Sequence, residues 1–223
     1  MAALKNDLLF LWEFDGDANE KIQGAHLSTT GSISYPAGKI KKCAYFSNPT
    51  GNATQNYLSR NAAPYIYIPA PSDVCTFSFW VNIITTGSSG ICGIAGHSIY
   101  PAGQSWGFRA DNVYGSGKFR LMVSNGSGTN KYYTTALNLN TWYHFVIHAP
   151  SVVFVNGVKE TLDGNFSVLW GGTAPICFGV DDYDLNSRRL NGYIEQFAIW
   201  NRYLSDDEAL MLYNGGSGLD LEM

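Results

Sequence analysis

The chain has few charged residues and no long hydrophobic run. Charged residues make up 14% of its 223 residues, with 14 Lys and Arg against 18 Asp and Glu, for a net charge of -4. Nucleic-acid binding needs a basic patch, and an anionic membrane surface attracts clusters of Lys and Arg. No apolar run approaches the roughly 20 residues that span a bilayer. We therefore expect neither a nucleic-acid partner nor a membrane partner.

The N-terminus lacks the pattern of a secretory signal peptide. Its apolar segment, Leu8–Trp12, is short. Glu13, Asp15 and Asp17 follow at once, with no small-residue cleavage site. We expect the chain to begin in its first strand.

Cysteines are few and are not arranged as a zinc site. They stand at Cys43, Cys75, Cys92 and Cys177, and no Cys-x-x-Cys pair occurs. An even number permits two disulfides. Their apolar neighbours, in or beside predicted strands, favour reduced thiols buried in the core.

Glycine and aromatic residues are abundant and favour strands and turns over helices. The chain has 24 Gly, and Phe, Trp and Tyr make up 14%. Asn156-Gly157 predicts a hairpin turn because both residues tolerate positive φ. Short segments between turn signals predict strands at residues 8–14, 31–35, 43–46, 65–69, 75–84, 91–95, 105–109, 118–124, 131–135, 142–148, 152–155, 158–161, 176–179 and 193–200. No charge block, repeat or linker divides the chain, so we expect one domain over residues 1–223.

Two predicted strands alternate clearly between two faces. In residues 75–84, Phe77 and Phe79 share one face, and Trp80 lies on the other. If the Trp80 ring is buried between two sheets, its loss would be strongly destabilising. In residues 193–200, the first face consists of Ile194, Gln196, Ala198 and Trp200, and the second of Tyr193, Glu195, Phe197 and Ile199.

A short helix is predicted after the last strand. Ser205 and Glu208 form a capping box, and Leu204 is placed as the hydrophobic staple. The helix is expected to end at Gly215, which can take the left-handed conformation. Trp200 and this helix should hold the closing strand against the sandwich.

Several segments, in order, resemble the laminin-G-like, concanavalin A-like lectin/glucanase family. The resemblance implies an all-β fold, a two-sheet antiparallel jelly-roll sandwich, here with one short C-terminal helix. Members of the family mostly bind ligands, and only some are enzymes. The segments are residues 11–19 (LWEFDGDAN), 38–46 (GKIKKCAYF), 77–81 (FSFWV), 141–146 (TWYHFV), 154–158 (FVNGV) and 191–208.

Catalytic residues of such a fold are missing from the sequence. Glycosidases need two carboxylates flanking the scissile bond. Related glucanases show Glu-x-Asp-x-x-Glu on one strand, whereas Glu160 and Glu195 have no such partners. His144 and His148 share one strand face and could bind a metal, but a place beside the core fits them better. We expect no enzyme activity; a glycoside hydrolase or lyase is the alternative.

Calcium could bind at either of two places. Asp182, Asp184 and Asn186 place oxygen atoms at alternate positions, as in calcium loops. The resemblance implies a second place, where Asp15 and Asp17 come near Glu195. The alternative for the first segment is a solvated acidic turn.

Sugar recognition would use exposed aromatic rings with polar neighbours. The candidates on predicted loops and strand ends are Trp106, Arg109, Tyr114, Trp170 and Tyr183. Trp106 and Trp170 could instead close the core at the sheet edges.

The sequence therefore favours a non-catalytic, lectin-like binding or adhesion module for carbohydrate or a protein surface. The fold usually works outside cells, yet no export signal is visible. A phage virion component, such as a capsid decoration, fibre or tail protein, would reconcile the two. Such a protein would be virion-bound or extracellular, with other virion proteins as partners and an oligomer possible.

Overall fold

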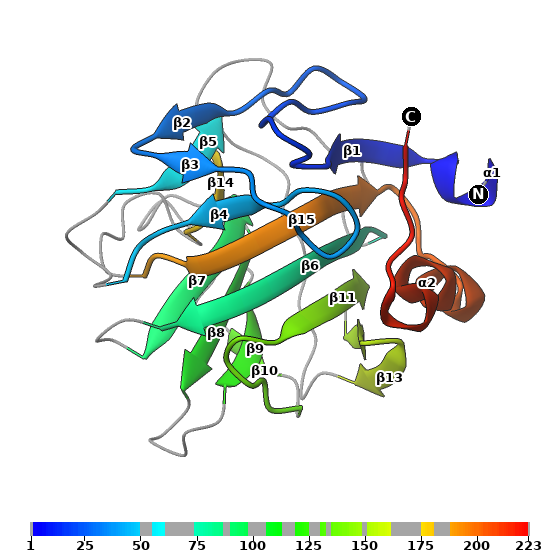
Figure 1. Ribbon diagram of the computed structural model, residues 1–223. Helices are drawn as coiled ribbons and strands as arrows, with labels where there is room; N and C mark the ends of the chain where they lie inside the picture. Colours follow the sequence, from blue (N-terminus) through cyan, green and yellow to red (C-terminus); the bar gives the residue numbers. More distant parts are fainter. Residues whose placement is uncertain are drawn as a thin grey trace.

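A computed structural model describes the fold over residues 2–49, 55–60, 74–86, 90–97, 106–112, 119–124, 130–132, 135–148, 151–161, 175–180 and 188–222. These residues form two facing antiparallel sheets with a short helix beside one of them (Figure 1). The predicted all-β, two-sheet antiparallel sandwich with a C-terminal helix is confirmed. The strand expected at residues 65–69 lies outside the described residues.

Sheet A contains the closing strand, and sheet B faces it across the core. Sheet A has the order β13 (Val158–Thr161), β12 (Val152–Val155), β11 (Trp142–His148), β6 (Thr76–Thr85), β15 (Asn191–Trp200), β4 (Ala44–Phe46) and β3 (Ile33–Ser34), with β1 (Leu8–Trp12) also pairing with β15. Sheet B has the order β10 (Asn130–Tyr132), β9 (Phe119–Ser124), β8 (Gly107–Asn112), β7 (Ile91–His97), β14 (Ile176–Phe178), β5 (Tyr57–Arg60) and β2 (Ser28–Thr30).

The space between the sheets is filled mainly by aromatic and branched side chains. The alternation predicted for β6 is confirmed, since Phe77, Phe79 and Val81 all point into this core. The ring of Phe79 stacks on Phe197 of β15, with centroids 5.3 Å apart and planes 14° apart. Such contacts between facing strands hold the two sheets together.

Trp80 is buried, but it does not lie between the sheets. It is 2% exposed and sits on the outer face of sheet A, with its ring 6.0 Å from that of Tyr213 in the C-terminal helix. The expectation of an inter-sheet position is therefore wrong. Trp80 follows Phe79 on a strand whose side chains alternate, and the helix supplies the cover that this face needs.

A second core lies between the outer face of sheet A and both ends of the chain. The short helix α1 (Ala2–Lys5), which the sequence did not predict, and α2 (Asp206–Tyr213) both contribute to it. The indole nitrogen of Trp200 donates a 2.7 Å hydrogen bond to the carbonyl oxygen of Leu4. Trp200 and α2 thus hold the closing strand as expected, through this second core.

The closing strand contains a β-bulge that the sequence did not predict. Gln196 has φ of 50°, and the pairing of β15 with β6 shifts between Glu195 and Ala198. Ile194 and Phe197 consequently both point into the main core. The strict alternation expected along β15 is wrong, because a bulge inserts one extra residue and reverses the side-chain pattern beyond it.

The predicted hairpin turn and capping box are confirmed, and the predicted helix end is off by one residue. Ser205 and Glu208 form the capping box of α2, and Leu204 is buried in the second core. The helix ends at Tyr213, and its left-handed cap is Asn214, with φ of 48°, instead of the predicted Gly215; Gly215 and Gly216 continue a short 3-10 turn. Asn156 and Gly157 both have positive φ and join β12 to β13.

Candidate functional site

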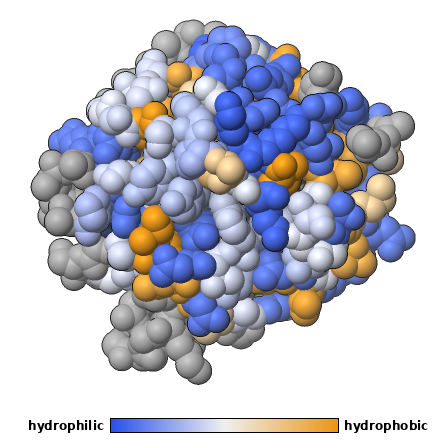
Figure 2. Space-filling view, in the orientation of Figure 1, coloured by the Kyte–Doolittle hydropathy of each residue, from blue (hydrophilic) through white to orange (hydrophobic). Residues whose placement is uncertain are grey.

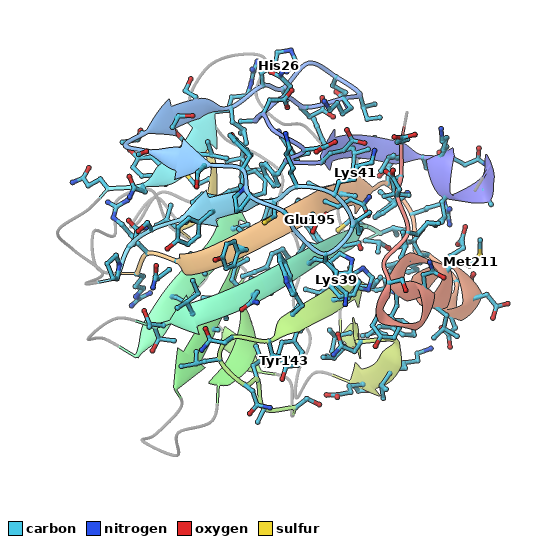
Figure 3. All side chains as sticks on the ribbon, viewed as in Figure 1. His26, Lys39, Lys41, Tyr143, Glu195 and Met211 are labelled. Carbon is cyan, nitrogen blue, oxygen red and sulfur yellow. The ribbon has the colours of Figure 1, made fainter. Side chains whose placement is uncertain are left out.

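The outer face of sheet A has a covered part and an open part. The covering loop, residues 36–42, lies over β15, and Figure 3 shows Lys39 and Lys41 of this loop on either side of Glu195. Helix α2 lies over β11 and β12 beside it (Figure 1). The open part begins two residues further along these strands, at Asn82, Tyr193 and Trp142.

Glu195 holds the covering loop in place. Its carboxylate accepts hydrogen bonds from the backbone N–H groups of Lys39 (2.5 Å), Ile40 (2.9 Å) and Lys41 (2.7 Å). Gly38 has to be a glycine, because a Cβ there would lie 2.4 Å from the Glu195 Oε2 atom. Burial raises the pKa of Glu195, while the three N–H groups act in the opposite direction.

This geometry does not suit the calcium role predicted for Glu195. Its side chain is 1% exposed, and three N–H donors surround the two oxygen atoms. A cation would have to displace those donors. Glu195 is therefore a structural anchor of the loop, and we remove it from the candidate metal ligands.

Trp80 and His144 form the floor beneath the cover. Their rings are 4.8 Å apart, and the Lys39 ammonium lies 5.6 Å from the centre of the Trp80 ring. The Nε2 atom of His144 is 3.0 Å from the Ser78 hydroxyl. Burial lowers the pKa of His144 to about 3, so the ring is neutral near pH 7. These contacts give His144 a structural place on the sheet.

The open part carries a row of half-exposed aromatic residues, which we call the aromatic row: Tyr45 of β4, Tyr193 of β15 and Trp142 of β11. Tyr193 is the cross-strand partner of Tyr45 and of Asn82, and Asn82 is the partner of Trp142. The rings of Tyr45 and Tyr193 are 4.8 Å apart, and those of Tyr193 and Trp142 are 6.0 Å apart. The three rings thus form one continuous surface over β4, β15, β6 and β11.

Asn82 adds a polar atom to the aromatic row. Its Oδ1 atom is buried and has no hydrogen-bond partner among the described residues. A buried amide oxygen without a donor costs about 1–3 kcal/mol. Figure 2 shows mainly pale residues of intermediate hydropathy over the middle of this face, which fits Tyr and Trp side chains.

Sequence reasoning missed the aromatic row because its members come from separate strands. Tyr45 and Trp142 lie within resemblance segments that pointed to the core, and Tyr193 belongs to the closing strand. No local spacing links them. A signal did exist: each stands on the strand face opposite to core residues, next to Ala44, Tyr143 and Ile194.

Of the predicted sugar-contacting residues, Trp106 lies in the core. It is fully buried, and its ring lies 4.8 Å from Phe77 and 6.0 Å from Phe197. Its ring therefore offers no face to a sugar, and the alternative of a core residue is the correct one. Trp106 directly precedes β8, whose Phe108 points into the same core.

Arg109 lies half-buried on the outer face of sheet B, between the core residues Phe108 and Ala110. Its strand partner on β7 is Gly93, which also bridges to Arg189. The Arg189 guanidinium lies 5.0 Å from the centre of the Tyr57 ring. Arg109 therefore lies on the opposite face of the molecule from the aromatic row. Tyr114, Trp170 and Tyr183 lie outside the described residues.

Asp15 and Asp17 lie in an exposed turn. Asp17 accepts hydrogen bonds from both nitrogens of Asn19 and lies 3.7 Å from the Lys21 ammonium. Within the described ranges, no three His, Cys, Asp or Glu side chains gather as a metal site. Asp182, Asp184 and Asn186 fall in the gap at residues 181–187. Calcium binding therefore stays a prediction.

A second buried carboxylate, Glu20, escaped the sequence reasoning. It is 3% exposed and accepts hydrogen bonds from four backbone N–H groups. The donors are Leu11, Ile22, Gln23 and Ala25. Glu20 thus holds the turn after β1 against that strand, and nothing in its local sequence distinguishes it from an exposed acidic residue.

The four cysteines are buried and unbridged, in line with the expectation of reduced thiols. Cys75 and Cys92 belong to the main core. Burial raises the pKa of Cys43 to about 12, so this thiol is not ionised near pH 7.

Among the described residues, no helix is both long and apolar enough to span a membrane.

A family profile described as the concanavalin A-like lectin/glucanases superfamily matches residues 52–209. The chain belongs to this superfamily. No curated protein matches the chain. Solved structures at 15–18% sequence identity match nearly all of the chain, so they share its fold.

The concanavalin A-like neighbours include binding domains. Domain 4 of AbnA, a GH43 extracellular arabinanase from Geobacillus stearothermophilus solved with arabinotriose, has a TM-score of 0.68 at 18% identity and covers 96% of this chain and 98% of its own. The binding domain of botulinum neurotoxin serotype D has a TM-score of 0.65 at 15% identity, covering 97% of this chain and 52% of its own. That of Paraclostridial Mosquitocidal Protein 1 has a TM-score of 0.64 at 18% identity. The chain spans about half of each toxin domain.

Proposed function

We propose that this protein is a non-catalytic carbohydrate-binding module whose ligand lies on the aromatic row. The observation that carries the proposal is the continuous surface of Tyr45, Tyr193 and Trp142, half-exposed on the outer face of sheet A. Aromatic rings pack against the C–H groups of sugars, and polar atoms beside them bind hydroxyl groups. Asn82, which is partly exposed on the strand between Tyr193 and Trp142, carries an amide group for this role.

The concanavalin A-like neighbours support a binding role. Domain 4 of AbnA was solved with arabinotriose, and the toxin structures are binding domains. A saccharide is therefore the first ligand to test, and a protein surface is the second.

Two buried carboxylates support the non-catalytic part of the proposal. Glu195 and Glu20 are enclosed by backbone N–H groups. Neither oxygen pair is free to protonate a glycosidic oxygen or to attack a sugar carbon, as hydrolysis requires. A glycoside hydrolase or lyase remains the alternative function.

Isothermal titration calorimetry would test the proposal. We expect an oligosaccharide from an arabinan and neutral-glycan panel to bind, and the double variant Tyr193→Ala, Trp142→Ala to bind about tenfold more weakly or worse. Tyr203→Ala is the matched control, because Tyr203 is 43% exposed beside α2 and lies outside the aromatic row.

Two results would contradict the proposal. Equal affinity of the double variant and the wild type would place the ligand elsewhere, with Arg109 and sheet B as the next region to test. Release of reducing ends from a bound polysaccharide by wild-type protein would show catalysis.

The setting of the module and its calcium binding remain predictions. Detection of the chain in purified phage particles by mass spectrometry would support a virion role.

Thermal denaturation with CaCl2 would test calcium binding. A rise in melting temperature that Asp182→Asn or Asp17→Asn removes would locate a calcium ion; no rise would argue against one.

A further inference from the structure

Two lysines of the covering loop, Lys39 and Lys41, differ in the groups that their ammonium ions contact. The Lys41 ammonium contacts the carboxylates of Asp220 and Glu222 in the C-terminal segment. The exposed Lys39 ammonium makes no ion pair with any residue that the structure describes, and its contact is with the face of Trp80. A cation–π contact holds an ammonium in place without neutralising it.

Lys39 also stands beside the aromatic row. Trp80 and Asn82 are two residues apart on the same face of β6, which separates them by about 7 Å along the strand. Asn82 is the strand partner of both Tyr193 and Trp142, so a glycan of two or three sugar units on the aromatic row would extend toward the Lys39 ammonium. Figure 3 shows Lys39 over sheet A, near Glu195.

The carboxylate nearest to the Lys39 backbone does not neutralise the ammonium. Glu195 directs its oxygen atoms at the N–H groups of residues 39–41, underneath the loop. The Lys39 side chain leaves the loop toward Trp80 instead. Lys39 therefore places a positive charge that has no ion-pair partner among the described residues over Trp80, on a chain whose net charge is -4.

We propose that the ligand is an acidic glycan, with Lys39 binding its carboxylate or sulfate group while the aromatic row holds the sugar rings. This inference rests on the proposed function. A flexible ammonium suits an anionic group of variable position, since it acts as a point charge and not as a planar fork. The sugar rings supply most of the contact, and the charge selects among glycans.

Titrations with matched acidic and neutral glycans would test this inference. The probes are polygalacturonate fragments against their methyl esters, and dextran sulfate against dextran. We expect wild-type protein to prefer the acidic member of at least one pair. Lys39→Gln should reduce that affinity about two- to fivefold at low ionic strength, and added salt should remove the difference. The two pairs distinguish a carboxylate from a sulfate.

Lys42→Gln is the matched control. Lys42 is exposed in the same loop, but its ammonium lies near Gly16 at the start of the chain. The inference is overturned if Lys39→Gln and Lys42→Gln bind the acidic glycan equally well, or if methyl esters and dextran bind as tightly as their acidic counterparts. Tyr193→Ala separates the two proposals. If Tyr193→Ala weakens glycan binding and Lys39→Gln does not, the proposed function is kept and the role of Lys39 is removed.

Discussion

Two neighbouring rows of the same sheet face have opposite surroundings. Glu195, Trp80 and His144 stand on adjacent strands of sheet A and are each at most 2% exposed. Two residues along the same strands, Tyr193, Asn82 and Trp142 are partly exposed. Both rows combine aromatic and polar side chains. The covering loop and α2 alone make the first row structural, and their absence over the second leaves a surface that can bind.

The largest effect is expected from Trp80→Ala in the covered row. The ring is buried against His144 and Tyr213, so its removal should lower the free energy of unfolding by about 3–5 kcal/mol. Urea denaturation would measure it. An unchanged midpoint would mean that the covered row is open in solution, and the contrast between the rows would fail.

The second-largest effect is expected from acid, which should lower the free energy of unfolding through His144 in the covered row. Burial lowers the pKa of His144 from 6.5 to about 3. Between these values the unfolded chain binds a proton that the folded chain does not, so stability is lost as the pH falls through this window. We expect a loss of about 2–3 kcal/mol from this residue between pH 6.5 and 4.5. Denaturation of wild type and His144→Gln at both pH values would isolate it; equal losses would contradict it.

Glu195→Gln should loosen the covering loop. Glutamine keeps one oxygen and turns an amide NH2 toward the remaining backbone donors, so we expect about 2 kcal/mol lower stability. Glu222→Gln is the control, since Glu222 is 69% exposed and such surface ion pairs contribute about 0–1 kcal/mol. Thermal denaturation would compare them, and equal shifts would argue against the anchoring role.

The smallest effect on stability is expected in the open row. Tyr193→Ala removes a partly exposed ring and should cost about 1 kcal/mol or less, while glycan binding is weakened. Paired denaturation and calorimetry would separate the two readouts. A stability loss as large as that of Trp80→Ala would show that the aromatic row is core and not a binding surface.

Much of the fold could be predicted from local patterns. The alternation of Phe77 and Phe79, the hairpin turn at Asn156 and the capping box of Ser205 each depend on residues a few positions apart. Their physical causes are side-chain alternation, positive φ and satisfied N–H groups at a helix start. The structure confirms all three.

The candidate site was much less accessible to sequence reasoning. Trp106 is of a residue type that often contacts sugars, but it is buried, because its position before β8 points its ring at Phe77. Glu195 has the charge of a metal ligand but is enclosed by a loop about 155 residues away in sequence. Burial and long-range partners decide such roles, and neither follows from local spacing.

The sequence by itself determined the strands, the turns, the capped helix and the membership of a concanavalin A-like fold, because these depend on short-range geometry and on motifs that keep their order. Only the tertiary structure decided which side of each strand is covered. The bulge at Gln196 reverses the pattern along β15, and the loop held by Glu195 covers one row and ends before the next. Exposure of the aromatic row is thus a property of long-range packing.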